Sequence, residues 1–378
     1  MGEPPGGEPA LYDIRILHVA DVHLDWPFGG QAGGRMRREE LKAVFASVID
    51  LAIREQVQVV LVAGDLFEHK YASRGTIQFI DEQLRRLRDV PVFISPGNHD
   101  PYVSGSYYET YPWAPNVHIF GPEPERVEVA GLPVSVRGWG FPAWEVRECQ
   151  LGRFPQPDPR RVNLVVVHGG DAAYHPFGAP DLAGLGADYI ALGHIHKEGV
   201  LLQQAGRVVA RYSGSPEALG FGEPGEHGVL VGTVSKEYTR LSWVPVGRRS
   251  YISIDVDVTG AVSMTDVAAA VRGAAPEADR RQHCYRLTLT GAVHPELRID
   301  LPVLQEQVSG DFYACKLFDA TVPDVDLAAL ARERSARGLF VQRLLAMEQQ
   351  EADPARRRIL RRALAHGLAA FAGKGGAR

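Results

Sequence analysis

Acids, amides and imidazoles follow apolar runs at five places in the first two thirds of this chain. The runs end in the motifs DVH, GDLFE, GNHD, VVHGG and GHIH. In open α/β sheets, ligands gather beyond the carboxyl ends of the strands. We therefore expect the polar side chains of these motifs to converge at one edge of a sheet: Asp21, His23, Asp65, Asn98, His99, Asp100, His168, His194 and His196.

Seven of these residues have the chemistry of metal ligands, namely Asp21, His23, Asp65, Asn98, His168, His194 and His196. Carboxylate, amide and imidazole groups without sulfur suit Mn²⁺, Fe or Zn²⁺. They are too many for one tetrahedral ion, but they fit two ions about 3.5–4 Å apart that share a carboxylate. Asp65 follows a middle strand, so we expect it to be the bridging ligand.

Two such ions suit phosphoester hydrolysis, because they lower the pKa of a water molecule and stabilise charge on the phosphoryl oxygens. No nucleophilic side chain is then needed. His99 is adjacent to a predicted ligand and is free to face the substrate, where it could protonate the leaving oxygen. We expect Asp100 to hold the His99 imidazole in orientation.

The other histidines do not follow this pattern, and a lone histidine is more often a structural residue. We expect structural roles for His18, His118, His227, His283, His294 and His366. For His69 and His175, which lie near the motifs, both alternatives stay open. Two alternatives also stay open for the aromatic residues between Asp100 and Pro115, which could stack on nucleobases or pack an irregular loop.

Apolar spacing predicts helices over residues 39–55 and around residues 77–87, between strands that begin near Ile14, Val57 and Val92. This β-α-β-α-β order predicts parallel strands with right-handed crossovers. Seven further strands follow with few helices, which favours two sheets packed face to face. They are expected at 117–120, 133–139, 164–167, 189–192, 208–212, 228–233 and 240–244.

The pattern changes near Gly247, where a second, shorter β-α-β-α-β unit begins, with helices expected at 264–272 and 301–308. It contains no cluster of potential ligands, so we expect a cap or recognition module. A helical tail with apolar stripes follows from Val325. The expected organisation is a disordered leader (1–10), a catalytic domain (11–247), an α/β cap (248–322) and a C-terminal helical region that binds a partner (323–378).

Bulk composition is that of an ordinary globular protein. The net charge of −5 neither indicates nor excludes a nucleic-acid substrate. No apolar run reaches the ~20 residues of a membrane-spanning helix, and the first ten residues lack the pattern of a signal peptide. The three cysteines lie far from the motifs, which argues against disulfides and suits a reducing compartment. We therefore expect a cytoplasmic protein without a membrane partner.

In order, the five motifs resemble the signature of the calcineurin-like metallophosphoesterases, over about residues 14–244. The resemblance implies an α/β (α+β) fold in which a metallophosphoesterase β-sandwich is flanked by helices. It also divides the ligands between two ions. One would be held by Asp21, His23, Asp65 and His196, and the other by Asp65, Asn98, His168 and His194, with His99 in the leaving-group role.

Within that superfamily the chain resembles SbcD-type DNA repair nuclease subunits, and among them a YhaO-like bacterial branch. ILHVADVHLD, LAIREQVQVVLVAGDLFE, YIALGHIHK and YSGSPEALGFGE carry this resemblance. It implies a Mn²⁺-dependent DNA phosphodiesterase, a 3′–5′ exonuclease with single-strand endonuclease activity as a further option, in repair or recombination. The implied partners are DNA and an SbcC-type ABC ATPase docked on the C-terminal helices, with a homodimer left open.

Two departures and two rival functions accompany this interpretation. Some family members have a histidine where this chain has Glu68, and LDWPF replaces a more common Leu-Gly form after the first motif. The first rival is a phosphatase or cyclic-nucleotide phosphodiesterase of the same superfamily that acts on small substrates. The second is a non-catalytic scaffold on the same fold, although such scaffolds usually lose ligands.

Overall fold

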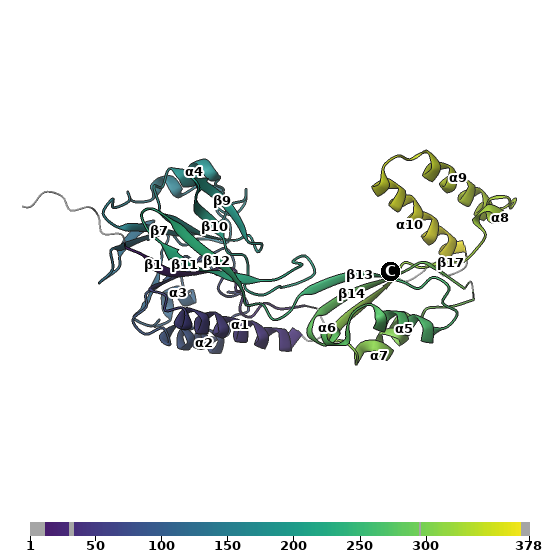
Figure 1. The fold of residues 1–378 in the computed structure, drawn as a ribbon, viewed down its shortest axis with the longest axis horizontal. Coiled ribbons are helices and arrows are strands. Elements are labelled where there is room, and N and C mark those ends of the chain that lie inside the picture. The colour runs from purple at the N-terminus through teal and green to yellow at the C-terminus, as the bar shows by residue number, and fades with distance from the viewer. Residues whose placement is uncertain (1–11, 30–33, 295, 372–378) are drawn as a thin grey trace, which may run out of the picture. The chain divides into compact units, whose positions relative to one another are not determined.

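The computed structural model describes residues 12–29, 34–294 and 296–371. The expected leader at residues 1–10 lies outside these ranges. The chain forms two compact units, Met1–Arg249 and Ser250–Arg378 (Figure 1). The small sheet and the C-terminal helices both fall in the second unit.

Two six-stranded sheets form the first unit. The first has the order β12-β11-β1-β2-β3-β4, and the second β5-β6-β7-β8-β10-β9. The strands of the first sheet are β1 (Ile14–Val19), β2 (Val59–Val62), β3 (Val92–Ile94), β4 (Val117–Ile119), β11 (Gly228–Val234) and β12 (Thr239–Pro245). Those of the second are β5 (Glu125–Glu128), β6 (Val134–Gly138), β7 (Val162–His168), β8 (Tyr189–Gly193), β9 (Gly199–Gln204) and β10 (Arg207–Tyr212).

Strands β1 to β4 are parallel, which confirms the predicted β-α-β-α-β order. Val19 pairs with Val62, and Val62 pairs with Ile94, so these three strands end at the same level. The helices between them are α1 (Gly34–Arg54) and α2 (Arg74–Arg85). The short helices of this unit are α3 (Tyr107–Thr110), η1 (Leu151–Arg153) and α4 (Ala179–Ala183).

The second sheet contains two strands that the sequence did not predict, β5 and β9. Both lie at sheet edges and are largely exposed or only half-buried. Their sequences, ERVE and GVLLQQ, lack the continuous apolar run that marked the buried strands. An edge strand with one pairing partner needs no such run, because water satisfies its other side.

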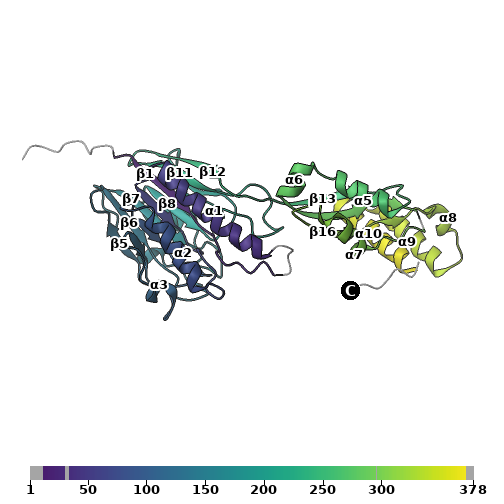
Figure 2. The same cartoon turned by 90° about the horizontal axis from the view of Figure 1, so that it is seen from below.

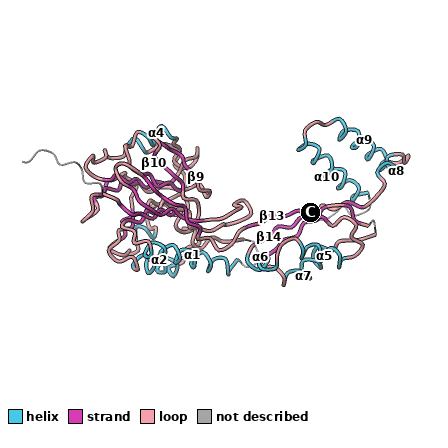
Figure 3. Tube along the Cα trace, in the orientation of Figure 1, coloured by secondary structure: helices cyan, strands magenta, loops and turns pink. Residues whose placement is uncertain are grey.

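The predicted face-to-face packing of the two sheets is confirmed by their shared core. Ile16 and Leu61 of the first sheet belong to one buried cluster with Val136, Leu164 and Ala191 of the second. The outer face of the first sheet packs against α1 and α2, which lie side by side along it (Figure 2). Strands therefore occupy the centre of the unit and helices its outside (Figure 3).

The second unit has a parallel three-stranded sheet of order β13-β14-β16. Its elements are β13 (Tyr251–Asp257), α5 (Met264–Gly273), α6 (Glu277–Gln282), β14 (Cys284–Thr290), β15 (Ala292–Val293), α7 (Leu301–Ser309), β16 (Ala314–Asp319), β17 (Val322–Pro323), α8 (Leu327–Ala331), α9 (Ala336–Gln350) and α10 (Pro354–Phe371). The predicted helices at 264–272 and 301–308 are thus confirmed within one residue. Helices α8 to α10 surround a small core of Leu330, Val341, Leu364 and Leu368.

No helix within the described ranges is long and apolar enough to cross a membrane. The three cysteines are free, as expected, and Cys149 is exposed.

Candidate metal centre

The predicted ligands occupy sharp turns at the strand ends. Asp21, His23 and Asp65 have φ values of 55°, 49° and 52°, and His194 has 103°. Left-handed backbone is unfavourable for residues with a Cβ and persists only where surrounding contacts hold it. Here the turns after β1 and β2 hold each other, because Asp21 N donates to Gly64 O (3.0 Å) and His23 N donates to Asp65 O (2.9 Å).

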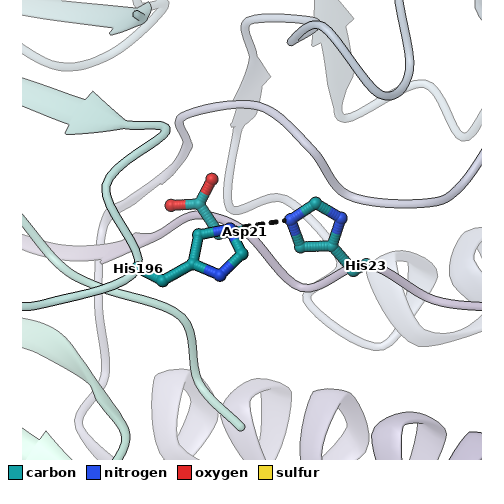
Figure 4. A group of neighbouring side chains, drawn as sticks. All are labelled: Asp21, His23 and His196. Carbon is teal, nitrogen blue, oxygen red and sulfur yellow. Dashed lines mark hydrogen bonds between the residues drawn. The ribbon is translucent and has the colours of Figure 1, made fainter. Parts of the chain in front are cut away.

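The first candidate set comprises Asp21, His23 and His196, whose ligand atoms all lie within 4.8 Å of one another. Figure 4 shows the two imidazoles facing each other beside the Asp21 carboxylate. Nε2 of His23 and Nε2 of His196 are 3.1 Å apart. Two nitrogens bound ~2.1 Å from one cation at a right angle would be about 3 Å apart, so this spacing fits a shared ion.

The second candidate set comprises Asp65, His168 and His194. The side-chain oxygen of Asn98 lies between the two rings, 3.0 Å from His168 Nε2 and 3.2 Å from His194 Nδ1. His168 donates its Nδ1 hydrogen to Ala63 O (2.8 Å), which leaves Nε2 facing the oxygens of Asn98 and Asp65. A nitrogen lone pair and several oxygens converge there, as a cation requires.

Asp65 lies between the two sets. Its Oδ2 is 3.7 Å from His23 Nε2 and 3.3 Å from His168 Nε2. Its Oδ1 accepts a hydrogen bond from the His99 N–H (2.8 Å). One oxygen of this carboxylate thus faces both histidine sets, and the buried His/Asp cluster is typical of a two-metal site.

In three of the histidines, the ring nitrogen that faces away from the other candidate ligands is hydrogen-bonded to a carboxylate, which braces the ring. His23 Nδ1 donates to Glu68 Oε1 (2.6 Å), His196 Nδ1 to Glu223 Oε1 (2.8 Å), and His194 Nε2 to Asp171 Oδ2 (2.8 Å). Such partners fix the tautomer and orientation of metal-binding imidazoles.

The bracing role of these three acids was not predicted from the sequence. All three stand in or beside motifs named above, since Glu68 closes GDLFE, Asp171 follows VVHGG directly and Glu223 closes YSGSPEALGFGE. An acidic residue close in sequence to one of the motifs was therefore the signal that could have predicted these bracing acids.

The electrostatics of the site favour positive charge. Burial alone would raise the pKa of Asp65, but the neighbouring imidazoles, His168 foremost, hold that pKa well below its usual range. Burial alone would lower the pKa of His168, but the carboxylate of Asp65 raises it to about 9. His196 behaves in the same way, with Glu223 and Asp21 raising its pKa to about 9. An environment that stabilises extra positive charge on imidazoles also favours bound cations.

The orienting partner of His99 differs from the expected one. His99 Nδ1 lies 3.0 Å from Glu68 Oε1 and 3.1 Å from Glu68 Oε2, so Glu68 braces both His99 and His23. Burial lowers the pKa of His99, but Glu68 and Asp65 outweigh burial and raise it. About 37% of the His99 side chain is exposed, which leaves it accessible to a substrate.

Asp100 instead ties two loops together, and the expectation that it orients the His99 ring is wrong. Its carboxylate accepts hydrogen bonds from the backbone N–H groups of Asp65, Leu66 and Gly97 and from the Tyr108 hydroxyl (2.7 Å). Burial and the charge of Asp65 raise the pKa of Asp100 to about 7. Asp100 therefore shapes the turn that presents Asn98 and His99.

Glycines allow this close approach of loops. A Cβ on Gly97 would lie 2.3 Å from Asp65 Oδ1, and a Cβ on Gly193 would lie 1.8 Å from Ala63 O. Either contact would push the GNHD or GHIH motif away from the strand end. The glycines of these two motifs are therefore a packing requirement of the site.

The structure also places the residues whose roles stayed open. His175 is buried and structural, because Nδ1 donates to His168 O (3.1 Å) and Nε2 accepts from Gln150 N (3.0 Å). His69 contacts the rings of Tyr107 and Trp144. All five aromatic residues of the loop after Asp100 pack on the core, namely Tyr102, Tyr107, Tyr108, Tyr111 and Trp113.

Comparisons with known proteins agree with this geometry. Residues 14–198 match the family described as calcineurin-like phosphoesterase, and this region contains all nine predicted site residues. A subunit of the nuclease SbcCD from Bacillus subtilis is 29% identical over 256 residues, which are 56% of this chain and 64% of that protein. DNA double-strand break repair protein Mre11 of Saccharolobus solfataricus is 27% identical over 224 residues, covering 54% of this chain and 55% of that protein.

A broader match is to a protein described as uncharacterized metallophosphoesterase YhaO of Bacillus subtilis. It is 31% identical over 360 residues, which are 85% of either chain. This similarity extends into both structural units and confirms the resemblance seen in the motifs. The chain belongs to the calcineurin-like metallophosphoesterase family.

Proposed function

We propose that this protein is a two-metal DNA phosphodiesterase, a 3′–5′ exonuclease with single-strand endonuclease activity as a further mode, in DNA repair or recombination. The placement of Asp65 carries the proposal. One of its oxygens faces the His23 and His196 side of the centre and also the His168 and His194 side.

The proposed ligands are Asp21, His23, Asp65 and His196 for one ion, and Asp65, Asn98, His168 and His194 for the other. Two divalent ions, with Mn²⁺ as the expected metal, would supply Lewis acidity and a water of lowered pKa for attack on phosphorus. His99 would donate a proton to the leaving oxygen, since its pKa is raised and its ring is accessible. Glu68 would keep the His99 ring pointed at that oxygen by accepting its Nδ1 hydrogen.

DNA as substrate is supported by two relatives, whose names describe a nuclease subunit and a double-strand break repair protein. We further propose that the small parallel sheet acts as a DNA-recognition cap. Helices α8 to α10 would dock an SbcC-type ABC ATPase, and apolar side chains exposed on them, such as Leu339, Met347 and Ile359, supply contact area.

The test compares cleavage of labelled single-stranded and double-stranded DNA with hydrolysis of a chromogenic phosphomonoester, each with Mn²⁺ and with a chelator. We expect metal-dependent DNA degradation from 3′ ends. Preference for the phosphomonoester would favour a phosphatase of the same superfamily. Activity that is insensitive to chelation would refute the two-metal mechanism.

A further inference from the structure

Trp144 is a large aromatic side chain exposed beside the metal centre. It lies on the loop that follows β6, and 49% of its surface is exposed. Its ring meets the His69 ring edge-on, with centroids 5.4 Å apart and an interplanar angle of 72°. His69 Nδ1 is buried and has no hydrogen-bond partner among the described residues.

Two contacts link the segments that carry these rings to the metal centre. His69 N donates to His99 O (3.0 Å), so His69 is bound to the backbone of the proposed proton donor. Phe141, three residues before Trp144, packs its ring against the His168 ring with centroids 5.6 Å apart. The pair is therefore linked to His99 through the His69 backbone, and the segment that carries Trp144 is linked to His168 through Phe141.

Packing does not account for Trp144 as it does for the loop aromatics. Tyr108 is buried and donates its hydroxyl hydrogen to Asp100, and Trp113 donates its ring N–H to Tyr107 O (3.0 Å). Those side chains are held in the fold. Trp144 belongs to none of the described hydrophobic clusters, and the residue is about half exposed.

We propose that Trp144 and His69 form a stacking platform for an unpaired nucleobase of the strand being cut, a proposal that rests on the proposed nuclease function and specifies its substrate. Base stacking on aromatic rings is tolerant of sequence because every base has a π-face. Burial lowers the pKa of His69, which keeps the ring neutral and suited to stacking. Lys70 follows at once, is exposed, and has no carboxylate partner among the described residues, so its charge suits the strand's phosphates.

A base in a duplex is paired and stacked on its neighbours, so it must be unpaired and unstacked before it can stack on this platform. The platform therefore favours single strands and frayed ends over fully paired DNA. It contributes to binding and leaves the chemistry at phosphorus unchanged, so its loss should affect KM for DNA more than kcat.

The experiment measures Mn²⁺-dependent cleavage of a single-stranded oligonucleotide and hydrolysis of bis(p-nitrophenyl) phosphate by Trp144→Ala, Trp144→Phe and Tyr12→Ala. Stacking worth ~1–3 kcal/mol per base predicts that Trp144→Ala raises the oligonucleotide KM about 5- to 150-fold. The kcat for the small diester should stay unchanged, because the ring pair takes no part in the chemistry at phosphorus. Trp144→Phe should restore most of the oligonucleotide affinity.

Tyr12 is the matched control, because it is also exposed but precedes β1, at the opposite end of that strand from Asp21. Tyr12→Ala should match the wild type on both substrates. An unchanged oligonucleotide KM in Trp144→Ala would overturn the platform while leaving the proposed nuclease function intact. An equal loss of activity on both substrates would also overturn it, because Trp144 would then only support the structure of the site. A wild-type protein that hydrolyses the small diester but no oligonucleotide would overturn the proposed function and the platform with it.

Discussion

Glu68 is the residue whose substitution most directly tests the proposed chemistry. Its buried carboxylate accepts from His23 Nδ1 (2.6 Å) and from His99 Nδ1 (3.0 Å). Burial raises its pKa, but hydrogen bonds from the two rings outweigh burial and lower it, so the group is held as the anion. Glu68→Gln removes the charge and leaves one acceptor oxygen for two ring N–H groups.

The expected size of the effect follows from these contacts. A hydrogen bond to a charged group contributes about 1.5–3 kcal/mol, which corresponds to about 10- to 150-fold in rate. Loss of the brace on a metal-binding imidazole costs a similar 10–100-fold in affinity or activity. We therefore expect Glu68→Gln to lower kcat for DNA by about 10- to 150-fold.

The assay separates the two roles of Glu68 by leaving group. Protonation matters most for the poor alkoxide leaving group of DNA and little for a p-nitrophenolate. The matched control is Glu223→Gln, since Glu223 braces His196 and has no contact with His99. Glu223→Gln should weaken metal binding and lower both activities together, whereas Glu68→Gln should lower DNA cleavage more than hydrolysis of bis(p-nitrophenyl) phosphate.

Two results would refute this reasoning. If Glu68→Gln cleaved DNA at the wild-type rate, the orienting role of Glu68 would be wrong. If Glu68→Gln and Glu223→Gln lost both activities in the same proportion, Glu68 would act only through the metal ligand His23. In that case His99 would need another source of orientation.

Four further predictions follow from other contacts. Asp65→Asn should lower occupancy of both metal sites in metal analysis, and two tightly retained ions would contradict a bridging role. His99→Ala should keep both ions yet lose about 100- to 10,000-fold in DNA cleavage; an unchanged turnover would remove His99 from the mechanism. Truncation after Pro323 should spare hydrolysis of a chromogenic diester but weaken binding of the ATPase, whereas unchanged affinity would exclude docking through α8 to α10. Burial lowers the pKa of His18 from 6.5 to about 3, so its stabilising contribution is complete above pH 6.5 and is lost as the pH falls toward 3. The free energy of unfolding, measured in urea, should fall by about 2 kcal/mol less in His18→Gln than in the wild type between about pH 6.5 and 5. An unchanged pH dependence would exclude His18 as the source of that loss.

The strand-end residues could be predicted from the sequence because their positions depend on local patterns. An apolar run followed by Asp21, Asp65 or His168 specifies both a buried strand and a polar group at its end. Parallel pairing aligns the ends of β1 and β2 in the first sheet, and the face-to-face packing of the two sheets brings the end of β7 beside them. The edge strands β5 and β9 were missed because their half-exposed sequences resemble loops.

The acids around the histidines could not be assigned from local sequence, since loop geometry decides which ring each acid reaches. Asp100 follows His99 directly, yet its carboxylate turns to the N–H groups of Asp65, Leu66 and Gly97. Buried backbone donors in two facing turns need acceptors, and the Asp100 carboxylate supplies them. The His99 ring is instead hydrogen-bonded to Glu68, 31 residues earlier in the chain. Sequence adjacency suggested the wrong carboxylate because the backbone of the turns competes for it.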